Sequence, residues 1–489
     1  MLSRRRFLWH GGVLGLATAC ARPRRVGPPV VVNDIHSRLN ETTVAALIRP
    51  DSTEAVARAV ADARREGLAV SVAGGRHAMG GQQFGAGTVL LDMRGMKRVL
   101  AVEPEAGVVE VEAGIQWPEL IGHLLRAQRG RRPALSIVQK QTGADRLTLG
   151  GALAANIHGR GLRFTPIVGD VESFVMVGAD GVARTCDRRR DAELFRLAIG
   201  GYGLFGVITS VRLRLAPRRT LERVVQVMDV DDLVPAVERR VADGFLFGDF
   251  QYATDHTSAD FLRRGVFSCY RPVEGRTPPD TQKELSEADW RSLLLLSHAD
   301  KKRAFERYSA YYLATSGQRY WSDTHQLSVY LDDYHRWLDR QLGAATPATE
   351  MITEIYAPRP ALLRLLDDAR RGLGDARADV IYGTIRFIER DDETFLAWAR
   401  DRYACVIVNL HVVHTPAGVE AAARAFRALI DAAIANGGSY FLTYHRWATR
   451  RQVEACYPQL AEFLRLKRRH DPEERFQSEW YRHHKALLA

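Results

Sequence analysis

The sequence predicts an α+β protein made of several domain-sized units. The chain has 489 residues, of which 46% are hydrophobic and 26% charged, as expected for two to four globular domains. Its regular structure opens with a βαβ-like unit and continues with short strands and a hairpin. Beyond Pro217 the expected strands and helices become longer, and glycine becomes rarer. A separate second domain is therefore expected after this point.

The first twenty residues are interpreted as an export signal. Paired arginines within residues 3–8 precede an apolar, glycine-rich run from Gly11 to Ala19, and small residues close it. This order is typical of a signal peptide, and the arginines followed by Phe-Leu resemble a twin-arginine signal. Cys20 is a candidate lipid attachment point, with simple cleavage after Ala19 as the alternative. Residues 21–40, rich in proline and arginine, are expected to form a tether.

The first folded unit is expected to be strand, helix and strand. An apolar strand covers residues 44–48, Ser52 is a helix cap, and alanines and valines then recur at helical spacing. A second strand at residues 68–72 runs into the glycine-rich segment 73–81. Such a segment exposes consecutive backbone N–H groups and is suited to bind pyrophosphate. It does not fit the G-x-G-x-x-G pattern, so a Rossmann NAD site is not supported.

The remaining elements follow from hydrophobic patterning and turn residues. Helices are expected at 117–125, at 193–198 and from about Thr449 onward, and strands at 89–92, 98–102, 108–111, 171–177, 183–185 and 207–215. Two more glycine-rich segments lie at 141–159 and 200–206. The paired Gly150 and Gly151 permit close backbone approach to a flat ligand.

Charge and cysteine content exclude several classes of protein. The formal net charge is +11, but the excess is scattered in short clusters and no nucleic-acid-binding motif accompanies it. A membrane surface or an anionic substrate suits this dispersed charge better than nucleic acid. The five cysteines form no CxxC pair, which argues against a zinc ribbon or a thioredoxin-type site. Four of them are expected to be core thiols, with one disulfide as an alternative.

The three glycine-rich segments, together with Asp471-Pro472 and Phe476, resemble the FAD-linked oxidases of the vanillyl-alcohol oxidase and p-cresol methylhydroxylase type. Within that superfamily the chain looks closest to the alditol and aldonolactone oxidases and decaprenylphosphoryl ribose oxidase. The resemblance implies a two-part FAD-binding domain interrupted by a cap domain. The FAD domain would comprise residues 41–217 and a returning segment at 449–489, and the cap would comprise residues 218–448.

The same resemblance implies a set of FAD contacts. His77, with Gly81 four residues later, matches a family histidine that bonds the 8α carbon of the flavin. Residues 139–161 contain no cysteine, so a second covalent bond is not expected. The full set of expected cofactor-binding residues is Gly74, Gly75, Arg76, His77, Gly80, Gly81, Thr142, Gly143, Gly150, Gly151, Asn156, Gly206, Ile208 and Gln477.

Five residues are expected to act on the substrate, namely His158, Arg386, His411, Tyr444 and His445. Histidine supplies a base whose pKa lies near neutral pH. Arg386 matches an arginine of the alditol oxidases, whereas Thr384 stands where they have glutamate. Tyr444 stands where a family segment ends in a catalytic lysine.

The neighbouring histidines, His411 and His414, are not expected to chelate a metal. On a strand, side chains three positions apart face opposite sides. No metal site is predicted.

The expected reaction is removal of hydride from the CH–OH group of an alcohol, lactol or polyol, with oxygen or another acceptor reoxidising the flavin. The flavin would supply the difficult chemistry and the protein the positioning. Amine oxidation and reduction of a carbon–carbon double bond remain alternatives, because the aromatic residues Trp321, Tyr330, Tyr334 and Trp337 suit a flat or apolar ligand. A non-enzymatic flavin-binding or periplasmic binding protein is the third possibility.

Overall fold

The computed structural model describes residues 28–275, 277–279, 281–328, 331 and 333–489. The predicted signal peptide, Cys20 and the first part of the tether lie outside the described residues, as does Tyr330. Among the described helices, none combines the length and the apolar character needed to cross a membrane.

The molecule is a mixed α/β protein whose N-terminal part contains three small sheets. The first pairs β1 with β2, and the second is parallel, with strand order β3-β5-β4. The third sheet is antiparallel, with order β10-β9-β11-β7-β6 and β8 paired to β11. The strands are β1 (Val30–Val32), β2 (Thr42–Val44), β3 (Ala46–Ile48), β4 (Val70–Ala73), β5 (Val89–Asp92), β6 (Val99–Glu103), β7 (Val108–Glu112), β8 (Leu135–Ile137), β9 (Val171–Val177), β10 (Ala183–Asp187) and β11 (Val207–Pro217).

Four helices accompany these sheets, namely α1 (Thr53–Arg65), α2 (Trp117–Ala127), α3 (Leu149–Ala155) and α4 (Ala192–Ala198). The predicted cap of the first helix is confirmed, because the Ser52 hydroxyl accepts a hydrogen bond from the Ala55 amide at 3.1 Å. Its buried face packs against the parallel sheet. No helix was expected at α3, because two glycines near its start weaken the helical pattern.

The second part of the chain builds one eight-stranded antiparallel sheet, with order β15-β12-β14-β13-β17-β18-β16-β19. The predicted domain boundary at 217/218 falls between β11 and β12, the first strand of this sheet. The strands are β12 (Thr220–Asp229), β13 (Phe247–Tyr252), β14 (Arg264–Pro272), β15 (Arg319–Trp321), β16 (Ala348–Pro358), β17 (Val380–Ile388), β18 (Tyr403–Val413) and β19 (Ser439–Tyr440). The helices of this part are α5 (Leu233–Ala242), α6 (Glu287–Ala299), α7 (Lys301–Ala314), α8 (Tyr334–Leu342), α9 (Leu362–Asp375) and α10 (Pro416–Ala435).

The large sheet has one apolar face and one mixed face. Because side chains alternate along a strand, residues of one parity share a face. Helices α9 and α10 pack over β16 and β18 with apolar residues such as Leu366, Phe426 and Ile430. The opposite face, which includes Glu354 of β16 and Arg386 of β17, borders a cavity shared with the N-terminal part. The sheet thus presents polar side chains to that cavity.

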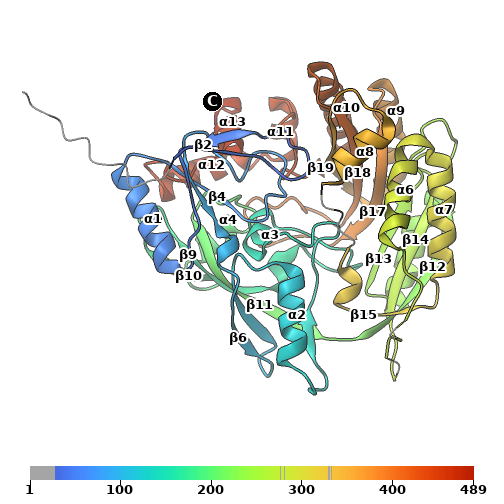
Figure 1. Ribbon diagram of the computed structural model, residues 1–489, viewed down its shortest axis with the longest axis horizontal. Coiled ribbons are helices and arrows are strands. Elements are labelled where there is room, and N and C mark those ends of the chain that lie inside the picture. Colours follow the sequence, from blue (N-terminus) through green and yellow to red (C-terminus); the bar gives the residue numbers. More distant parts are fainter. Residues whose placement is uncertain (1–27, 276, 280, 329–330, 332) are drawn as a thin grey trace, which may run out of the picture.

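The C-terminal segment returns to the N-terminal part, where Figure 1 shows its red helices beside the blue elements. Phe476 forms a parallel bridge to Val70 of β4, and the Gln477 amide donates to the Val70 carbonyl at 2.9 Å. The helices of this segment are α11 (Arg450–Cys456), α12 (Leu460–His470) and α13 (Glu479–Leu487). Chain ends that are far apart in sequence therefore build one part of the molecule.

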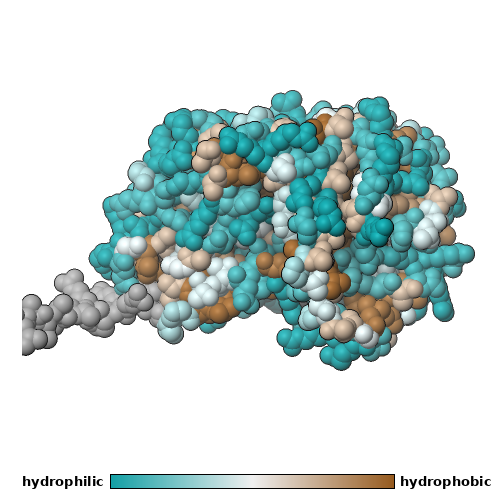
Figure 2. Space-filling model, turned by 90° about the horizontal axis from the view of Figure 1, so that it is seen from above, coloured by the Kyte–Doolittle hydropathy of each residue, from teal (hydrophilic) through white to brown (hydrophobic). Residues whose placement is uncertain are grey.

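Polar residues dominate the visible surface, and the described cysteines lie in the apolar interior. The face seen in Figure 2 is mainly hydrophilic, with hydrophobic patches that are small and separate. Cys186, Cys269, Cys405 and Cys456 are buried and free, so the expectation of core thiols is confirmed and the alternative disulfide is absent among these described cysteines.

Candidate active site

A cavity of about 770 Å³ lies between the N-terminal part and the large sheet. One side is lined by the glycine-rich segments at 74–79, 141–151 and 203–206, and the other by the polar face of the sheet. Close contacts with neighbouring segments leave no room for a side chain at Gly74 or Gly150. A Cβ atom on Gly74 would lie 2.0 Å from Oγ1 of Thr148, and one on Gly150 would lie 2.9 Å from the Cβ of Ala113. Bare backbone therefore faces the cavity.

Most of the residues expected to bind the cofactor do line this cavity, namely Gly74, Gly75, Arg76, His77, Thr142, Gly143, Gly150, Gly151, Gly206 and Ile208. Three buried polar atoms among them, Nε of Arg76, Nε2 of His77 and Oγ1 of Thr142, make no hydrogen bond to described residues. A long, flat ligand with many acceptors and donors fits such a wall. The residues present therefore fit FAD.

Four of the expected cofactor residues lie outside the cavity lining. Asn156, in the left-handed conformation at the end of α3, donates to Asp391 at 2.8 Å. The Gln477 side chain donates to the Glu474 carbonyl at 2.9 Å. Gly80 packs instead against the Tyr444 carbonyl, and Gly81 packs against Glu479 of the C-terminal segment. Their contacts are structural, and a direct role in FAD binding stays a prediction.

His77 is buried and paired with a second histidine. Its Nδ1 atom lies 2.8 Å from Nε2 of His36, which also lines the cavity. Burial, followed by the neighbouring His36, holds the pKa of His77 well below its usual value, although the Arg146 carbonyl acts in the opposite direction. Burial also lowers the pKa of His36, against the effect of Asp34. Both rings are therefore neutral near pH 7, and the buried Nε2 of His77 makes no hydrogen bond to described residues.

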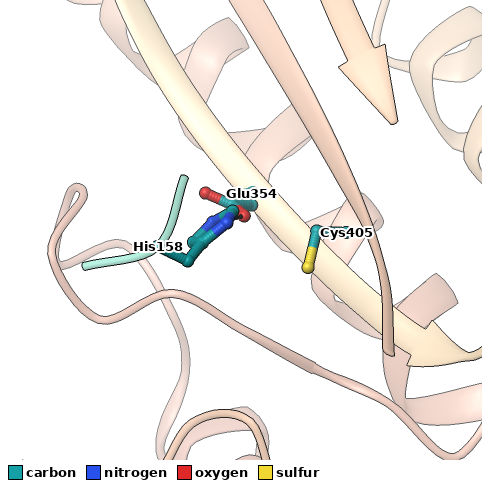
Figure 3. Close-up of side chains that lie close together, drawn as sticks. All are labelled: His158, Glu354 and Cys405. Carbon is teal, nitrogen blue, oxygen red and sulfur yellow. Dashed lines mark hydrogen bonds and ion pairs between the residues drawn. The ribbon is translucent and has the colours of Figure 1, made fainter. Parts of the chain in front are cut away.

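His158 forms a buried pair with Glu354, and Figure 3 shows the two side chains pointing toward each other. Nε2 of His158 lies 2.6 Å from Oε1 of Glu354, while Nδ1 lies 3.1 Å from the Gly159 carbonyl oxygen. Because both neighbours of the ring are oxygen atoms, Nδ1 donates to the carbonyl and one proton lies between Nε2 and Oε1. The Tyr444 hydroxyl donates to the other oxygen of Glu354 at 3.4 Å. The three groups form a proton-handling cluster in the cavity wall.

Arg386 lies on the same face of the sheet as this cluster. Thr384 and Glu354 both pair with Ile407 of β18, one from each side, so they occupy one row of the sheet. Thr384 replaces the family glutamate, but Glu354 supplies a carboxylate to the same row from two strands away. Arg386, two residues further along β17, lines the cavity.

The two other candidate catalytic histidines do not reach the cavity lining. His411, on β18, makes an edge contact with the ring of His298 at a centroid distance of 5.0 Å. His445 stacks on Trp447 at 4.3 Å, and burial lowers its pKa to about 4. His414 lies beyond the end of β18, and its Nε2 is 2.8 Å from Oγ1 of Thr349. These positions lend no support to direct catalysis by His411 or His445, whose roles stay predictions.

Cys405 extends the His158–Glu354 pair into a cluster with three possible metal ligands. One ligand atom from each residue lies within 4.8 Å of the others. Burial, and then the charge of Glu354, raise the pKa of the Cys405 thiol well above its usual value. A metal needs the thiolate, and the His158–Glu354 hydrogen bond already occupies the other two ligands. The cluster is therefore better suited to proton transfer.

Two residues of this site, His36 and Glu354, were missed by sequence analysis. Glu354 is the one charged residue in the strand pattern Met351 to Tyr356, and an acid on a buried strand is a usable signal. His36 lies within the expected tether, residues 21–40, and carries no such signal. Of the aromatic residues expected in the cap, Tyr334 lines the cavity, whereas the described Trp321 and Trp337 do not.

Comparison with known proteins agrees with this geometry. Residues 44–187 match the model of a family described as FAD binding domain. L-gulono-1,4-lactone dehydrogenase of Mycobacterium tuberculosis strain H37Rv is 26% identical over 450 residues, covering 90% of this chain and 95% of that protein. Decaprenylphosphoryl-beta-D-ribose oxidase of Mycolicibacterium smegmatis is 28% identical over 181 residues, covering 36% of this chain and 38% of its own.

A third relative matches a similar share of the chain. Cytokinin dehydrogenase 4 of Oryza sativa subsp. japonica is 29% identical over 197 residues, covering 38% of this chain and 36% of its own. The matching family model, the glycine-lined cavity and the relative that covers nearly the whole chain lead to one conclusion. The chain carries a PCMH-type FAD-binding domain at residues 44–187 and is an FAD-linked oxidoreductase.

Proposed function

We propose that this protein oxidises the CH–OH group of a small hydroxylated substrate, of the aldonolactone or polyol type. The observation that carries the proposal is the cluster of His158, Glu354 and Tyr444 in the wall of a cavity that fits FAD. The relative that aligns over 90% of the chain is named as a lactone dehydrogenase. The relative named as a cytokinin dehydrogenase aligns over 38%, so it gives weaker support to amine oxidation.

The chain's own residues would take the hydroxyl proton. The His158–Glu354 pair holds one proton between Nε2 and Oε1, and the remaining lone pairs of Glu354 can accept a second from a substrate hydroxyl. Burial, and then Glu354, raise the pKa of Tyr444 well above its usual value, which keeps the phenol protonated as a hydrogen-bond donor. Arg386 makes no ion pair with described residues and can bind a substrate oxygen. Bound FAD would accept the hydride at N5.

His77 is proposed to hold FAD covalently. The His36 contact engages Nδ1 of His77, which leaves Nε2, without a hydrogen bond to described residues, on the cavity side. That nitrogen would bond the 8α carbon in place of one of its hydrogens, which would leave as a proton, and the two electrons left on the flavin would pass to oxygen or another acceptor. The glycine-lined segments would enclose the pyrophosphate. Residues 41–217 and 449–489 are proposed to form the FAD-binding domain, with residues 218–448 as its cap.

Export is a separate proposal that rests on the sequence of residues 1–20. The twin-arginine pattern would carry the folded, FAD-loaded protein out of the cytoplasm, either cleaved or anchored at Cys20. Mass spectrometry of the protein from its native cell envelope would decide between cleavage and lipidation. A mature protein that retains residue 1 would refute both.

The function is tested by anaerobic flavin bleaching with purified, yellow protein. A panel of aldonolactones and alditols should bleach the absorbance near 450 nm, whereas cytokinin-type amines should not. Oxygen and an artificial electron acceptor would then be compared as oxidants of the reduced enzyme. Bleaching by an amine and by no alcohol would overturn the proposed substrate class.

A further inference from the structure

Arg223 lines the cavity as a buried cation without an anionic partner. Its side chain comes from β12, and the residue is 8% exposed. Nε and Nη2 donate to the Tyr270 hydroxyl at 2.9 and 2.7 Å, and Nη1 donates to Oγ1 of Thr315 at 2.9 Å. The guanidinium lies 4.5 Å from the ring centre of Tyr320. No carboxylate among the described residues forms an ion pair with it, although a buried charge is costly unless it is paired.

Arg160 brings a second cation to the same place. Its guanidinium lies 5.2 Å from the ring centre of Tyr270, which is also the distance for Arg223. One Nη atom donates to the His325 carbonyl, but the buried Nε makes no hydrogen bond to described residues. Arg160 follows His158 by two residues, so it connects this region to the proton-handling cluster.

The carboxylates of the cavity wall do not balance these charges. Phe250 of β13 pairs with Ile385 of β17, which sets Asp249 and Arg386 side by side on the cavity face. Asp249 is 4% exposed, yet its Oδ1 makes no hydrogen bond and it forms no ion pair with described residues. Burial raises the pKa of Glu350, the other wall carboxylate without an ion pair, and so favours its neutral form. Three arginines, Arg160, Arg223 and Arg386, therefore outnumber Asp249, the wall carboxylate that the strand register sets beside Arg386.

His325 adds a hydrogen-bond acceptor between the arginines. Its Nδ1 lies 3.2 Å from the Trp321 carbonyl, and its buried Nε2 makes no hydrogen bond to described residues. Burial, and then Arg160 and Arg223, hold its pKa well below the usual value, so the ring is neutral. With Nδ1 donating, Nε2 offers a lone pair. Asp249 and His325 can thus accept from hydroxyl groups while the arginines bind anionic oxygen.

We propose that Arg160, Arg223, Asp249 and His325, here called the arginine pocket, bind a carboxylate or phosphate group of the substrate together with its adjacent hydroxyls. The inference rests on the proposed oxidation of an alcohol and names its substrate class, a hydroxylated anion. In the strand order, β13 and β16 are three positions apart, which is about 14 Å at the usual strand spacing. The anionic group thus lies well away from the carbon beside Glu354.

The test compares three probes that share a hydroxylated chain, namely D-glucitol, D-gluconate and D-glucitol 6-phosphate. Their affinities for the FAD-loaded, full-length protein are measured without turnover, from the change in flavin fluorescence. At least one anionic probe should bind about tenfold or more tightly than glucitol, because hydrogen bonds to charged groups are the stronger kind. Comparing the affinities of the two anionic probes then shows whether the pocket prefers a carboxylate or a phosphate. Equal affinity for all three would overturn the proposal.

Two variants then test whether the arginine pocket causes the tighter binding of the anionic probe. Arg160→Gln and Arg223→Gln should each remove the preference for the anionic probe while the affinity for glucitol stays within about twofold. Arg160→Gln keeps the test decisive if the more buried Arg223→Gln fails to fold. Arg359→Gln is the matched control, because Arg359 is a buried arginine paired with Glu389 outside the cavity lining.

Two outcomes separate this inference from the proposed function. If Arg160→Gln still binds the anionic probe more tightly than glucitol, the arginine pocket is refuted. This holds even if the protein oxidises alcohols as proposed. If the anionic probe binds through Arg160 but neither it nor any alcohol bleaches the flavin, the pocket stands and alcohol oxidation is refuted.

Discussion

Nε2 of His36 lies 2.8 Å from Nδ1 of His77, although the two residues are 41 positions apart in the chain. Burial lowers the pKa of both imidazoles, so a neutral pair occupies this edge of the cavity near pH 7. The contact fixes the orientation of the His77 ring and selects the nitrogen that faces the glycine-lined wall. His36 is in turn placed next to Asp34, whose Oδ1 accepts from the His36 backbone amide at 3.0 Å.

The first prediction concerns covalent attachment of FAD. His77→Ala should abolish acid-stable yellow colour and the mass increase of one FAD, while reversible FAD binding persists. His36→Ala should slow attachment by about tenfold or more, because the partner that orients the ring and can accept its proton is lost. Intact mass is followed over time after FAD is added to the apoprotein.

The control for this experiment is His256→Ala, a change at an exposed histidine in a turn. Attachment at the wild-type rate in His36→Ala would show that the histidine pair has no role in it. Acid-stable flavin in His77→Ala would place the covalent bond elsewhere.

The second prediction concerns the proton-handling cluster. Glu354→Gln removes the carboxylate that shares a proton with His158, and an amide cannot accept a second proton in its place. We expect kcat to fall by about 100-fold, with little change in FAD content, as for loss of a general base. Glu420→Gln on the surface of α10 is the control. An unchanged kcat in Glu354→Gln would remove the pair from the mechanism.

The glycine-rich segments that line the cavity could be predicted from the sequence. A backbone position with no room for a side chain requires glycine, and glycine is visible in the sequence itself. Gly74, Gly75 and Gly150 stand where a side chain would collide with a neighbouring segment, and this requirement is visible as glycine in the sequence. The short apolar strands at residues 89–92 and 171–177 were likewise predicted with the bounds that the structure has. Patterns of this kind need no knowledge of distant contacts.

The substrate side of the site could not be predicted in the same way. Glu354, Thr384 and Arg386 come together only through the register of β16, β18 and β17, in which Ile407 of β18 pairs with Glu354, 53 residues away, and with Thr384, 23 residues away. Asn156 looked like a flavin contact in its glycine-rich context, but tertiary structure directs its side chain to Asp391. Positions fixed by strand order and domain contacts therefore leave little trace in local sequence.

The third prediction tests the close approach of the glycine-rich wall. In Gly75→Ala, the new Cβ would lie 2.3 Å from the Arg146 carbonyl oxygen and 2.8 Å from the Cδ2 atom of His77. Backbone and the histidine ring must both move, so FAD occupancy should fall by about tenfold or more for a strain of about 1–3 kcal/mol. The ratio of absorbance at 450 and 280 nm measures occupancy.

Gly374→Ala, in open space on α9, should bind FAD as wild type does. Full occupancy in Gly75→Ala would show that the wall tolerates a side chain.

The fourth prediction concerns stability against pH. Burial raises the pKa of Asp170 to about 7, against the opposing hydrogen bond from Gln139 at 3.0 Å. An unfolded aspartate has a pKa of about 3.9, so the folded state binds the proton more tightly, and stability falls as the pH rises from about 4 to about 7. Asp170→Asn keeps an oxygen for Gln139 and removes the charge. Its Tm should exceed that of wild type by about 2 °C or more at pH 8, with the difference shrinking toward pH 5 and vanishing near pH 4. Asp392→Asn, at an exposed site, should show no such trend, and a Tm difference for Asp170→Asn that is equal at pH 5 and pH 8 would refute the raised pKa.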